Sequence, residues 1–432
     1  MRTTRRHTQI LSVATLLALG LTACGTGTTT DSATSSAAPS ASAIPRAADV
    51  STSVGEPSGK TVEEGSRAAR LAITHDEGVI VLDAVSLELL GEFPLSGFTR
   101  LNPVGDGRHL MVTEGEGFRV LDLGGWSLPH GDHDHHHSTR PTLTDMTFPA
   151  EHPGHVVVHD GRTVLYGDGD GSIRSFDSDA LRDGATAKPE VTTRAERTPH
   201  HGVAVEREDG SIVTTVGTAE ERSGIVIRDA KGARVASSDE CPGVHGEAAA
   251  QGGALVFGCE DGLLLVKDDD ITKIDAPDDY GRIGNQAGSE ESPFVLGDYK
   301  TDPEAELERP TRVSITDTRD GSLRLVDLPA SYSFRSLERG PDGEGVVLGT
   351  DGRLHLIDMA KGEVSRSVDV VDEWTEPTDW QQPRPTVHVQ DGTAYVTDPA
   401  SKELHLVDLH SGEVISSGAL PVVPNEIDGT LG

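Results

Sequence analysis

Short runs of alternating apolar and polar residues dominate the chain, and this period of two predicts β-strands rather than helices. Eight of these runs end on an aspartate that is followed by a turn and another strand-like run. The eight aspartates recur at intervals of 39 to 55 residues and are Asp83, Asp122, Asp177, Asp229, Asp268, Asp317, Asp358 and Asp408. Four short strands per interval, joined by tight Gly/Asp turns, are typical of a β-propeller blade.

Eight repeats predict an all-β propeller with eight blades, and seven blades remain the alternative if one weak repeat is miscounted. The first repeat lacks an inner strand, because the sequence before Arg70 resembles a linker. The last repeat is followed by PVVPNEIDGTLG (residues 421–432), which resembles an inner strand. We therefore expect the C-terminal strand to complete the first blade and close the ring.

The N-terminus has the features of an export signal over residues 1–23. Basic residues at Arg2, Arg5 and Arg6 precede an apolar stretch that ends in Leu-Thr-Ala-Cys. This stretch is shorter than the ~20 residues that cross a bilayer. The Leu-Thr-Ala-Cys sequence matches a bacterial lipobox and predicts cleavage before Cys24 and its lipidation. An ordinary signal peptide with a chance cysteine is the alternative.

Residues 24–65 are rich in Ser, Thr, Ala, Gly and Pro, and they predict a flexible tether from Cys24 to a propeller domain at residues 66–432. The expected location is the bacterial cell envelope, with the exported protein anchored by its lipid on the outer face of the cytoplasmic membrane. Only the lipid is expected to contact the membrane.

The net charge of −34 arises from 71 Asp and Glu residues against 37 Lys and Arg residues. Such a field repels nucleic acids and anionic lipid surfaces and attracts cations. Cys241 and Cys259 remain after lipidation of Cys24, and an exported pair about one hairpin apart predicts a structural disulfide. We expect a monomer.

Histidines recur where three successive rim-to-channel connections lead into an inner strand. The connections contain Pro153-Gly-His155, Pro199-His200-His201 and Pro242-Gly-Val-His245. Equivalent positions in consecutive blades point to one axis. We therefore expect His155, one or both of His200 and His201, and His245 to converge at one mouth of the channel.

Three imidazoles and one carboxylate form a ligand set that suits Zn²⁺. Glu247 and Asp160 are the nearest carboxylates in sequence, so either is a candidate fourth ligand. His159 follows His155 by four residues on the same strand face and is a supporting candidate. The alternative is that each histidine is a hydrogen-bonding spacer at a strand start.

A His-rich segment, HGDHDHHH, occupies residues 130–137. It follows residues 126–128 (WSL), which we predict to be the outer strand of the second repeat, and it precedes the connection to His155. We predict a mobile loop that captures the metal or releases it. Its candidate residues are His130, Asp132, His133, Asp134, His135, His136 and His137. The alternative is a solvated tract that binds any transition metal weakly.

Known catalytic motifs are missing from the sequence: it has no Gly-x-Ser-x-Gly, no phosphate-binding Walker loop and no HExxH. Asp168-Gly-Asp170-Gly-Ser172 resembles the start of a calcium loop but lacks the distal glutamate, so we interpret it as a hairpin turn.

Several separate motifs together resemble the AztD-type zinc metallochaperones over most of residues 68–432. They are HGDHDHHH, PGHVVVHDGRTVLYGDGDGSIRSFD, PHHGVAVE, CPGVHGEAAAQGGALVFGCEDGLLLV and LPVVPNEI. The resemblance implies an exported β-propeller that binds Zn²⁺ and passes it to the solute-binding protein of a zinc ABC importer. A His-rich flexible loop belongs to the family pattern, and Cys241 and Cys259 match its disulfide segment. The resemblance does not assign individual ligands, and the lipid anchor argues against free diffusion to a partner.

The sequence therefore predicts a zinc carrier that acts by ligand exchange and is not an enzyme. A metal-dependent propeller hydrolase or lactonase is one alternative, although only 4% of the residues are aromatic and few can line a substrate pocket. A metal-free interaction scaffold is another. Zinc affinity is expected to fall below pH ~6.5, because the ligands must be neutral imidazoles.

Overall fold

Short strands make up nearly all the regular structure in the computed structural model, which describes residues 41–55 and 59–432. One 3₁₀ turn, η1 (Ser178–Leu181), is present. Within the described ranges, no helix has the length and apolar character to cross a membrane. The predicted signal peptide, Cys24 and the tether up to residue 40 lie outside the described residues.

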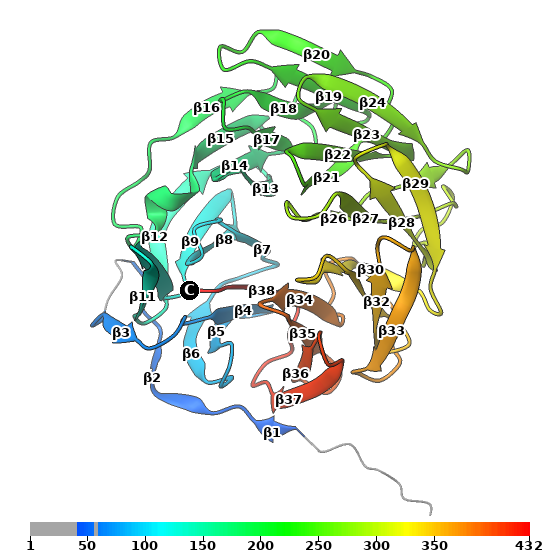
Figure 1. Ribbon diagram of the computed structural model, residues 1–432. Helices are drawn as coiled ribbons and strands as arrows, with labels where there is room; N and C mark the ends of the chain where they lie inside the picture. The colour runs from blue at the N-terminus through cyan, green and yellow to red at the C-terminus, as the bar shows by residue number, and fades with distance from the viewer. Residues whose placement is uncertain (1–40, 56–58) are drawn as a thin grey trace, which may run out of the picture. The chain divides into compact units, whose positions relative to one another are not determined.

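Eight sheets in the described part each contain four antiparallel strands, and we call these groups of four blades 1 to 8 (Figure 1). Blade 1 contains β38 (Ile427–Thr430), β4 (Arg70–His75), β5 (Gly78–Asp83) and β6 (Leu89–Pro94). Blade 2 contains β7 (Leu101–Pro103), β8 (His109–Glu114), β9 (Gly117–Asp122) and β12 (Thr142–Pro149). Blade 3 contains β13 (Pro153–His159), β14 (Arg162–Gly167), β15 (Ser172–Asp177) and β16 (Thr192–Ala195). Blade 4 contains β17 (Ala204–Glu206), β18 (Ile212–Gly217), β19 (Arg222–Arg228) and β20 (Arg234–Ser238).

The second half of the chain repeats the same strand order. Blade 5 contains β21 (His245–Ala250), β22 (Ala254–Cys259), β23 (Asp261–Lys267) and β24 (Asp270–Asp275), and β25 (Gly281–Arg282) pairs with β23. Blade 6 contains β26 (Gln286–Ala287), β27 (Phe294–Asp298), β28 (Arg312–Asp317) and β29 (Ser322–Asp327). Blade 7 contains β30 (Tyr332–Arg339), β31 (Gly345–Gly349), β32 (Arg353–Asp358) and β33 (Glu363–Asp369). Blade 8 contains β34 (Thr386–Gln390), β35 (Thr393–Asp398), β36 (Glu403–Asp408) and β37 (Glu413–Ala419). This architecture confirms the prediction of an all-β propeller fold.

The C-terminal strand β38 is the inner strand of blade 1. It pairs antiparallel with β4, with Asp428 opposite Ala72, and Glu426 O accepts a hydrogen bond from Thr74 N. Blade 1 is therefore built from the two ends of the described chain.

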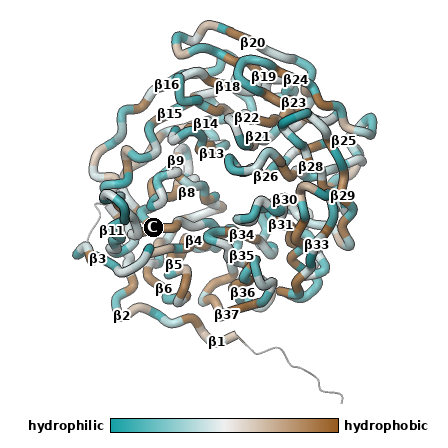
Figure 2. Tube along the Cα trace, in the orientation of Figure 1, coloured by the Kyte–Doolittle hydropathy of each residue, from teal (hydrophilic) through white to brown (hydrophobic). Residues whose placement is uncertain are grey.

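Apolar side chains fill the spaces between neighbouring blades. Leu71 and Ile73 of blade 1 share a buried cluster with Leu404 and Leu406 of blade 8. Similar clusters join the other neighbouring blades. Consecutive residues of strands such as β4, β5 and β8 are buried on both faces, so each sheet packs against its neighbours on both sides. Figure 2 shows hydrophobic stretches on the strands.

Residues 41–55 correct the predicted extent of the tether, because two strands in this segment pair with the blades. Strand β1 (Ser42–Ala43) lies parallel to β37, and β2 (Arg46–Ser51) lies parallel to β6. The outer strands of a propeller have free backbone groups that an added strand can bond. Ile44 and Val50 also pack on the cluster between blades 8 and 1. These two apolar residues were not recognised in the sequence, because the segment around them is rich in Ser, Thr and Ala.

The His-rich segment corrects a second prediction, because it forms a β-hairpin rather than an irregular loop. Strand β10 (Gly125–His130) pairs with β11 (His133–Ser138), and β11 pairs with β3 (Val62–Glu64) in a separate three-stranded sheet. The outer strand of blade 2 is β12 rather than residues 126–128. The chain leaves blade 2 at Gly124, whose φ is +80° and whose added Cβ would lie 2.5 Å from Thr139 O. The hairpin is thus inserted between the third and fourth strands of blade 2.

Candidate metal centre

Three histidines from blades 3, 4 and 5 meet where their inner strands begin. His155 lies near the start of β13, His201 precedes β17, and His245 is the first residue of β21. In β13 and β21 the pairing with the second strand shifts register at these positions. Such bulges redirect side chains locally, and here they accompany three imidazoles that face one another. We call these three residues the triad.

The triad has the dimensions of a metal site. Its three candidate ligand nitrogens all lie within 4.8 Å of one another. The Nε2 atoms of His201 and His245 are 3.1 Å apart, and the ring centroids of His155 and His201 are 4.9 Å apart. Tetrahedral Zn²⁺ with nitrogen ligands at about 2.0–2.1 Å needs nitrogens at such separations.

Hydrogen bonds at the Nδ1 atoms leave the Nε2 atoms of the triad free for a metal. His155 Nδ1 lies 2.9 Å from Gly202 O, and His245 Nδ1 lies 2.6 Å from Gly284 O. A carbonyl oxygen only accepts, so each Nδ1 donates and each neutral ring has its lone pair on Nε2. Lone pairs directed at one point repel one another unless a cation lies between them.

Asp168 orients the third imidazole. Its Oδ2 lies 2.5 Å from His201 Nδ1, and its Oδ1 lies close to Gly154, where an added Cβ would be 2.2 Å away. The glycine in Pro153-Gly-His155 therefore gives the carboxylate its space. A carboxylate on the second nitrogen of a ligating imidazole fixes its tautomer and strengthens it as a ligand. This role was not predicted from the sequence, because Asp168 lies in a segment that we interpreted as a hairpin turn.

Burial keeps two triad imidazoles neutral. It lowers the pKa of His155 to about 3, aided by the neighbouring His201 and His245 rings, and it lowers the pKa of His245 to about 3. Protonating either ring would place a charge in a poorly solvated site. Both rings are therefore available to a metal well below pH 6.5.

This pKa lowering predicts a shallow pH dependence of zinc affinity at the triad. Between pH 6.5 and about 4, protons do not compete with zinc at His155 or His245. We expect the dissociation constant to rise at most about tenfold per pH unit, against about a thousandfold if three imidazoles titrated together. Chelator competition at pH 7, 6 and 5, with the hairpin deleted, measures this slope. A slope of two or three protons per zinc would contradict the prediction.

His200 does not join the triad. Its side chain is buried, with Nε2 2.9 Å from Thr215 Oγ1 and Nδ1 2.9 Å from Thr198 O. Both ring nitrogens are thus used in the packing of blade 4. Of the two histidines after Pro199, only His201 faces the site.

Neither predicted fourth ligand lies in the triad. Glu247 is half-buried on β21 and lines a cavity together with His159 and Asp160. His159 and Asp160 form a separate group with Glu290. The register shift between His245 and Glu247 breaks the simple alternation of strand faces that the sequence prediction assumed. Asp168 is the carboxylate that contacts the triad.

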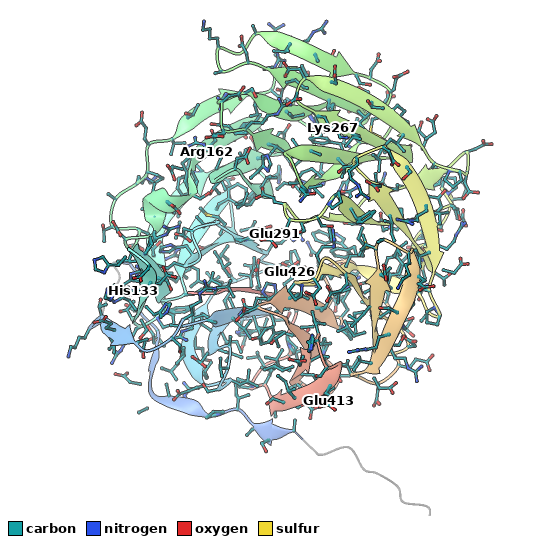
Figure 3. All side chains as sticks on the ribbon, in the orientation of Figure 1. His133, Arg162, Lys267, Glu291, Glu413 and Glu426 are labelled. Carbon is teal, nitrogen blue, oxygen red and sulfur yellow. A yellow bond between two sulfur atoms is a disulfide. The ribbon has the colours of Figure 1, made fainter. Side chains whose placement is uncertain are left out.

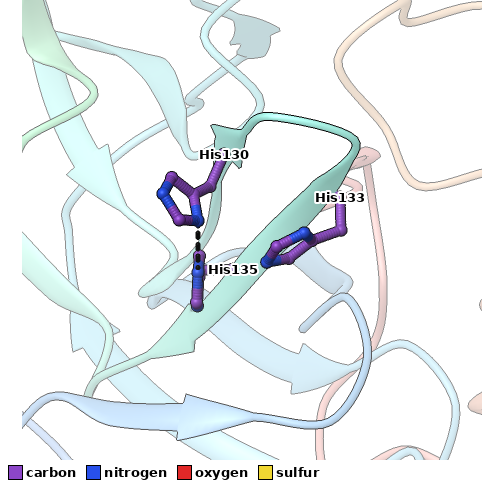
Figure 4. A group of neighbouring side chains, drawn as sticks. All are labelled: His130, His133 and His135. Atoms are coloured by element: carbon purple, nitrogen blue, oxygen red, sulfur yellow. Dashed lines mark hydrogen bonds between the residues drawn. The ribbon is translucent and has the colours of Figure 1, made fainter.

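A second histidine cluster lies on the hairpin (Figure 4). His130 and His133 are cross-strand partners, and His135 follows on the same face. The ligand nitrogens of these three residues lie within 4.8 Å of one another, and His135 Nε2 is 3.2 Å from His130 Nδ1. Period-two alternation explains the grouping, since residues 133 and 135 share one face of β11.

The other hairpin residues have different roles. His137 stacks on Trp126, and His136 Nδ1 lies 2.7 Å from Ser127 Oγ. Asp132 lies 3.2 Å from His133 Nδ1, and Asp134 opposite Pro129 is exposed.

Strand β3 adds a carboxylate to the hairpin cluster. Glu63 Oε1 lies 2.8 Å from His135 Nδ1, and this hydrogen bond lowers the pKa of Glu63. Glu63 was not predicted as a site residue, because it falls within the predicted tether.

The two histidine clusters are separate. In Figure 1, β11 lies at the outer edge of the blades, whereas β13, β17 and β21 lie near the centre. His133 projects at the same outer edge in Figure 3. The hairpin therefore does not cover the triad, and any passage of metal between the two clusters needs a rearrangement or a second protein.

Comparison with known proteins gives matches in sequence and in structure to the same protein. No protein family model matches the chain. The chain is 28% identical over 363 residues to the zinc chaperone AztD of Citrobacter koseri, which covers 81% of this chain and 83% of that protein. Crystal structures of Citrobacter koseri AztD and of its apo form superpose with TM-scores of 0.74 and 0.73, at 27% and 26% identity. They cover 85% of this chain and 98% and 99% of those chains.

A more distant structure supports the fold alone. Dihydro-heme d1 dehydrogenase NirN superposes with a TM-score of 0.51 at 12% identity, covering 84% of this chain and 74% of that chain. Its likeness carries no functional argument at this identity. By sequence and by structure together, the resemblance of this chain to the AztD-type zinc chaperones is confirmed.

Proposed function

We propose that this protein is an extracytoplasmic zinc chaperone that binds Zn²⁺ at the triad and delivers it to the solute-binding protein of a zinc ABC importer. The observation that carries the proposal is the convergence of three Nε2 lone pairs from three consecutive blades. The similarity to Citrobacter koseri AztD, whose name describes a zinc chaperone, supports zinc as the metal. Lipidation at Cys24 would hold the chaperone beside a membrane-bound importer.

Zinc would move by exchange of one imidazole at a time. The side chain of His201 is 45% exposed, whereas His155 and His245 are half-buried. An incoming ligand of the partner therefore reaches the metal beside His201 first. The hydrogen bond between His201 and Asp168 lets the His201 ring return to the same orientation after it has released the metal. The hairpin cluster would collect zinc at the surface, where His130 and His133 are exposed.

Zinc transfer to the solute-binding protein, in the presence of an excess of a strong chelator, tests the proposal. Direct exchange requires contact between the proteins, so zinc should reach the partner although the chelator traps every free ion. The hairpin deletion should slow loading of the chaperone more than transfer from it. Capture of all the zinc by the chelator would contradict direct delivery. Turnover of ester or lactone substrates by the zinc-loaded protein would favour a hydrolase instead.

A further inference from the structure

A cavity at the far end of β13 gathers titratable side chains that the triad does not use. His159 ends this strand, four residues beyond His155, which at ~3.3 Å per residue places it about 13 Å from the triad. The cavity has a volume of about 490 Å³ and is lined by His159, Asp160, Glu247, Gln286 and Glu290, among others. In Figure 3, Glu291, the neighbour of Glu290, lies near the middle of the view between the inner strands.

His159 is the best-shielded member of this group, with 3% of its surface exposed. Its Nδ1 lies 3.0 Å from Glu290 Oε1. Its Nε2 lies 3.1 Å from Asp160 Oδ2 but makes no hydrogen bond, although it is fully shielded from solvent. One ligand atom from each of the three residues falls within a common 4.8 Å. A buried ring nitrogen without a hydrogen bond, set between carboxylates, is a place where a cation would be stabilised.

Two further groups in the same cavity lack partners. The carboxyl group of Glu247 makes no hydrogen bond or ion pair with any described residue. Gln286 Oε1 is buried without a hydrogen-bond partner. A carboxylate and an amide oxygen are both ligands for hard divalent cations. The cavity therefore has an excess of unpaired acceptors and no lysine or arginine among its lining residues.

We propose that this cavity is a second metal site, in which His159, Asp160 and Glu290 hold a divalent cation and Glu247 completes the charge balance. One imidazole with carboxylates forms a harder ligand set than three imidazoles. The site should therefore accept Mn²⁺ readily, whereas the triad favours Zn²⁺. The site is independent of zinc delivery, since it shares no ligand with the triad or the hairpin.

Titration of the zinc-loaded full chain with Mn²⁺, followed by the electron paramagnetic resonance signal of free Mn²⁺, tests the site. Prior zinc loading fills the triad and the hairpin. We expect one Mn²⁺ to bind per chain without release of zinc. D160N and E290Q should each weaken Mn²⁺ binding by about tenfold or more. Asp160 has φ +47°, a conformation that Asn also adopts, so D160N should fold.

Asp391 provides a matched control. It occupies the corresponding turn between β34 and β35, also with φ +47°, but it follows Gln390 instead of a histidine. D391N should leave Mn²⁺ binding unchanged. An equal loss of Mn²⁺ binding in D391N and D160N would overturn the proposal, and so would no Mn²⁺ binding by the wild type together with equal zinc contents in D160N and D391N. If zinc already fills the site, D160N should lower the zinc content by one equivalent while D391N does not, and this result would support the site with zinc as its ion.

Discussion

Simultaneous replacement of His155, His201 and His245 by alanine is expected to abolish tight zinc binding. The three Nε2 atoms are the only converging nitrogens from blades 3 to 5 in the described part of the chain, and methyl groups cannot replace them. Deletion of residues 130–137 should leave this tight site intact, because the hairpin contributes no atom to it. Chelator competition with the domain from residue 41 onward, at pH 7, measures both effects.

Two single substitutions, one test and one control, measure how much a neighbouring side chain contributes to zinc binding at the triad. Asp168→Asn should weaken zinc binding about 10- to 100-fold, because the amide is a poorer partner for His201 Nδ1 than the carboxylate. His200→Gln is the matched control, since His200 neighbours His201 but bonds Thr215 and Thr198 instead. It should preserve zinc affinity even if it lowers thermal stability. Loss of all tight binding upon hairpin deletion, with the triple variant unaffected, would assign the tight site to the hairpin.

Removal of the disulfide should lower the free energy of unfolding by about 3 kcal/mol, the value for a loop of this size. Cys241 and Cys259 are bonded across 18 residues and are both fully buried. The bond closes the connection that leads to His245, so the unfolded chain gains freedom in this region when it is broken. Urea unfolding of the Cys241→Ala, Cys259→Ala variant measures the change.

Reduction of the wild type provides the control for this variant, because it breaks the bond without changing the packing. The two samples should unfold at similar urea concentrations, below that of the oxidised protein. Zinc affinity should change little while the variant is folded, since His245 is held by its hydrogen bond to Gly284 O. A change in unfolding free energy below about 1 kcal/mol would contradict a stabilising role for the disulfide.

Parts of the centre could be predicted from the sequence because they follow from the repeat. The Pro-x-His positions are equivalent in blades 3, 4 and 5, so convergence of their side chains follows from the rotational repeat of a propeller. Assignment of His201 over His200 could not be predicted, because the two residues are adjacent and only the packing of Thr215 distinguishes them. Similarly, a register shift between His245 and Glu247 keeps Glu247 out of the triad, and the local sequence pattern does not predict this shift.

The predicted position of the His-rich segment relative to the outer strand of blade 2 was wrong for a related reason. Both WSL (residues 126–128) and β12 have strand-like alternation, so the local pattern cannot tell which of them is the outer strand of blade 2. The choice depends on which strand pairs with β9, and β12 buries its alternate residues there.

The sequence by itself determined the strand repeat, the all-β class, the polar turns and the histidine positions, because each of these depends on a period of two or on a fixed repeat along the chain. Tertiary structure alone decided which carboxylate contacts which imidazole. Asp168 and His201 are 33 residues apart, and Glu63 and His135 are 72 apart. Such contacts depend on where neighbouring strands and blades come to lie, and no local periodicity records that placement.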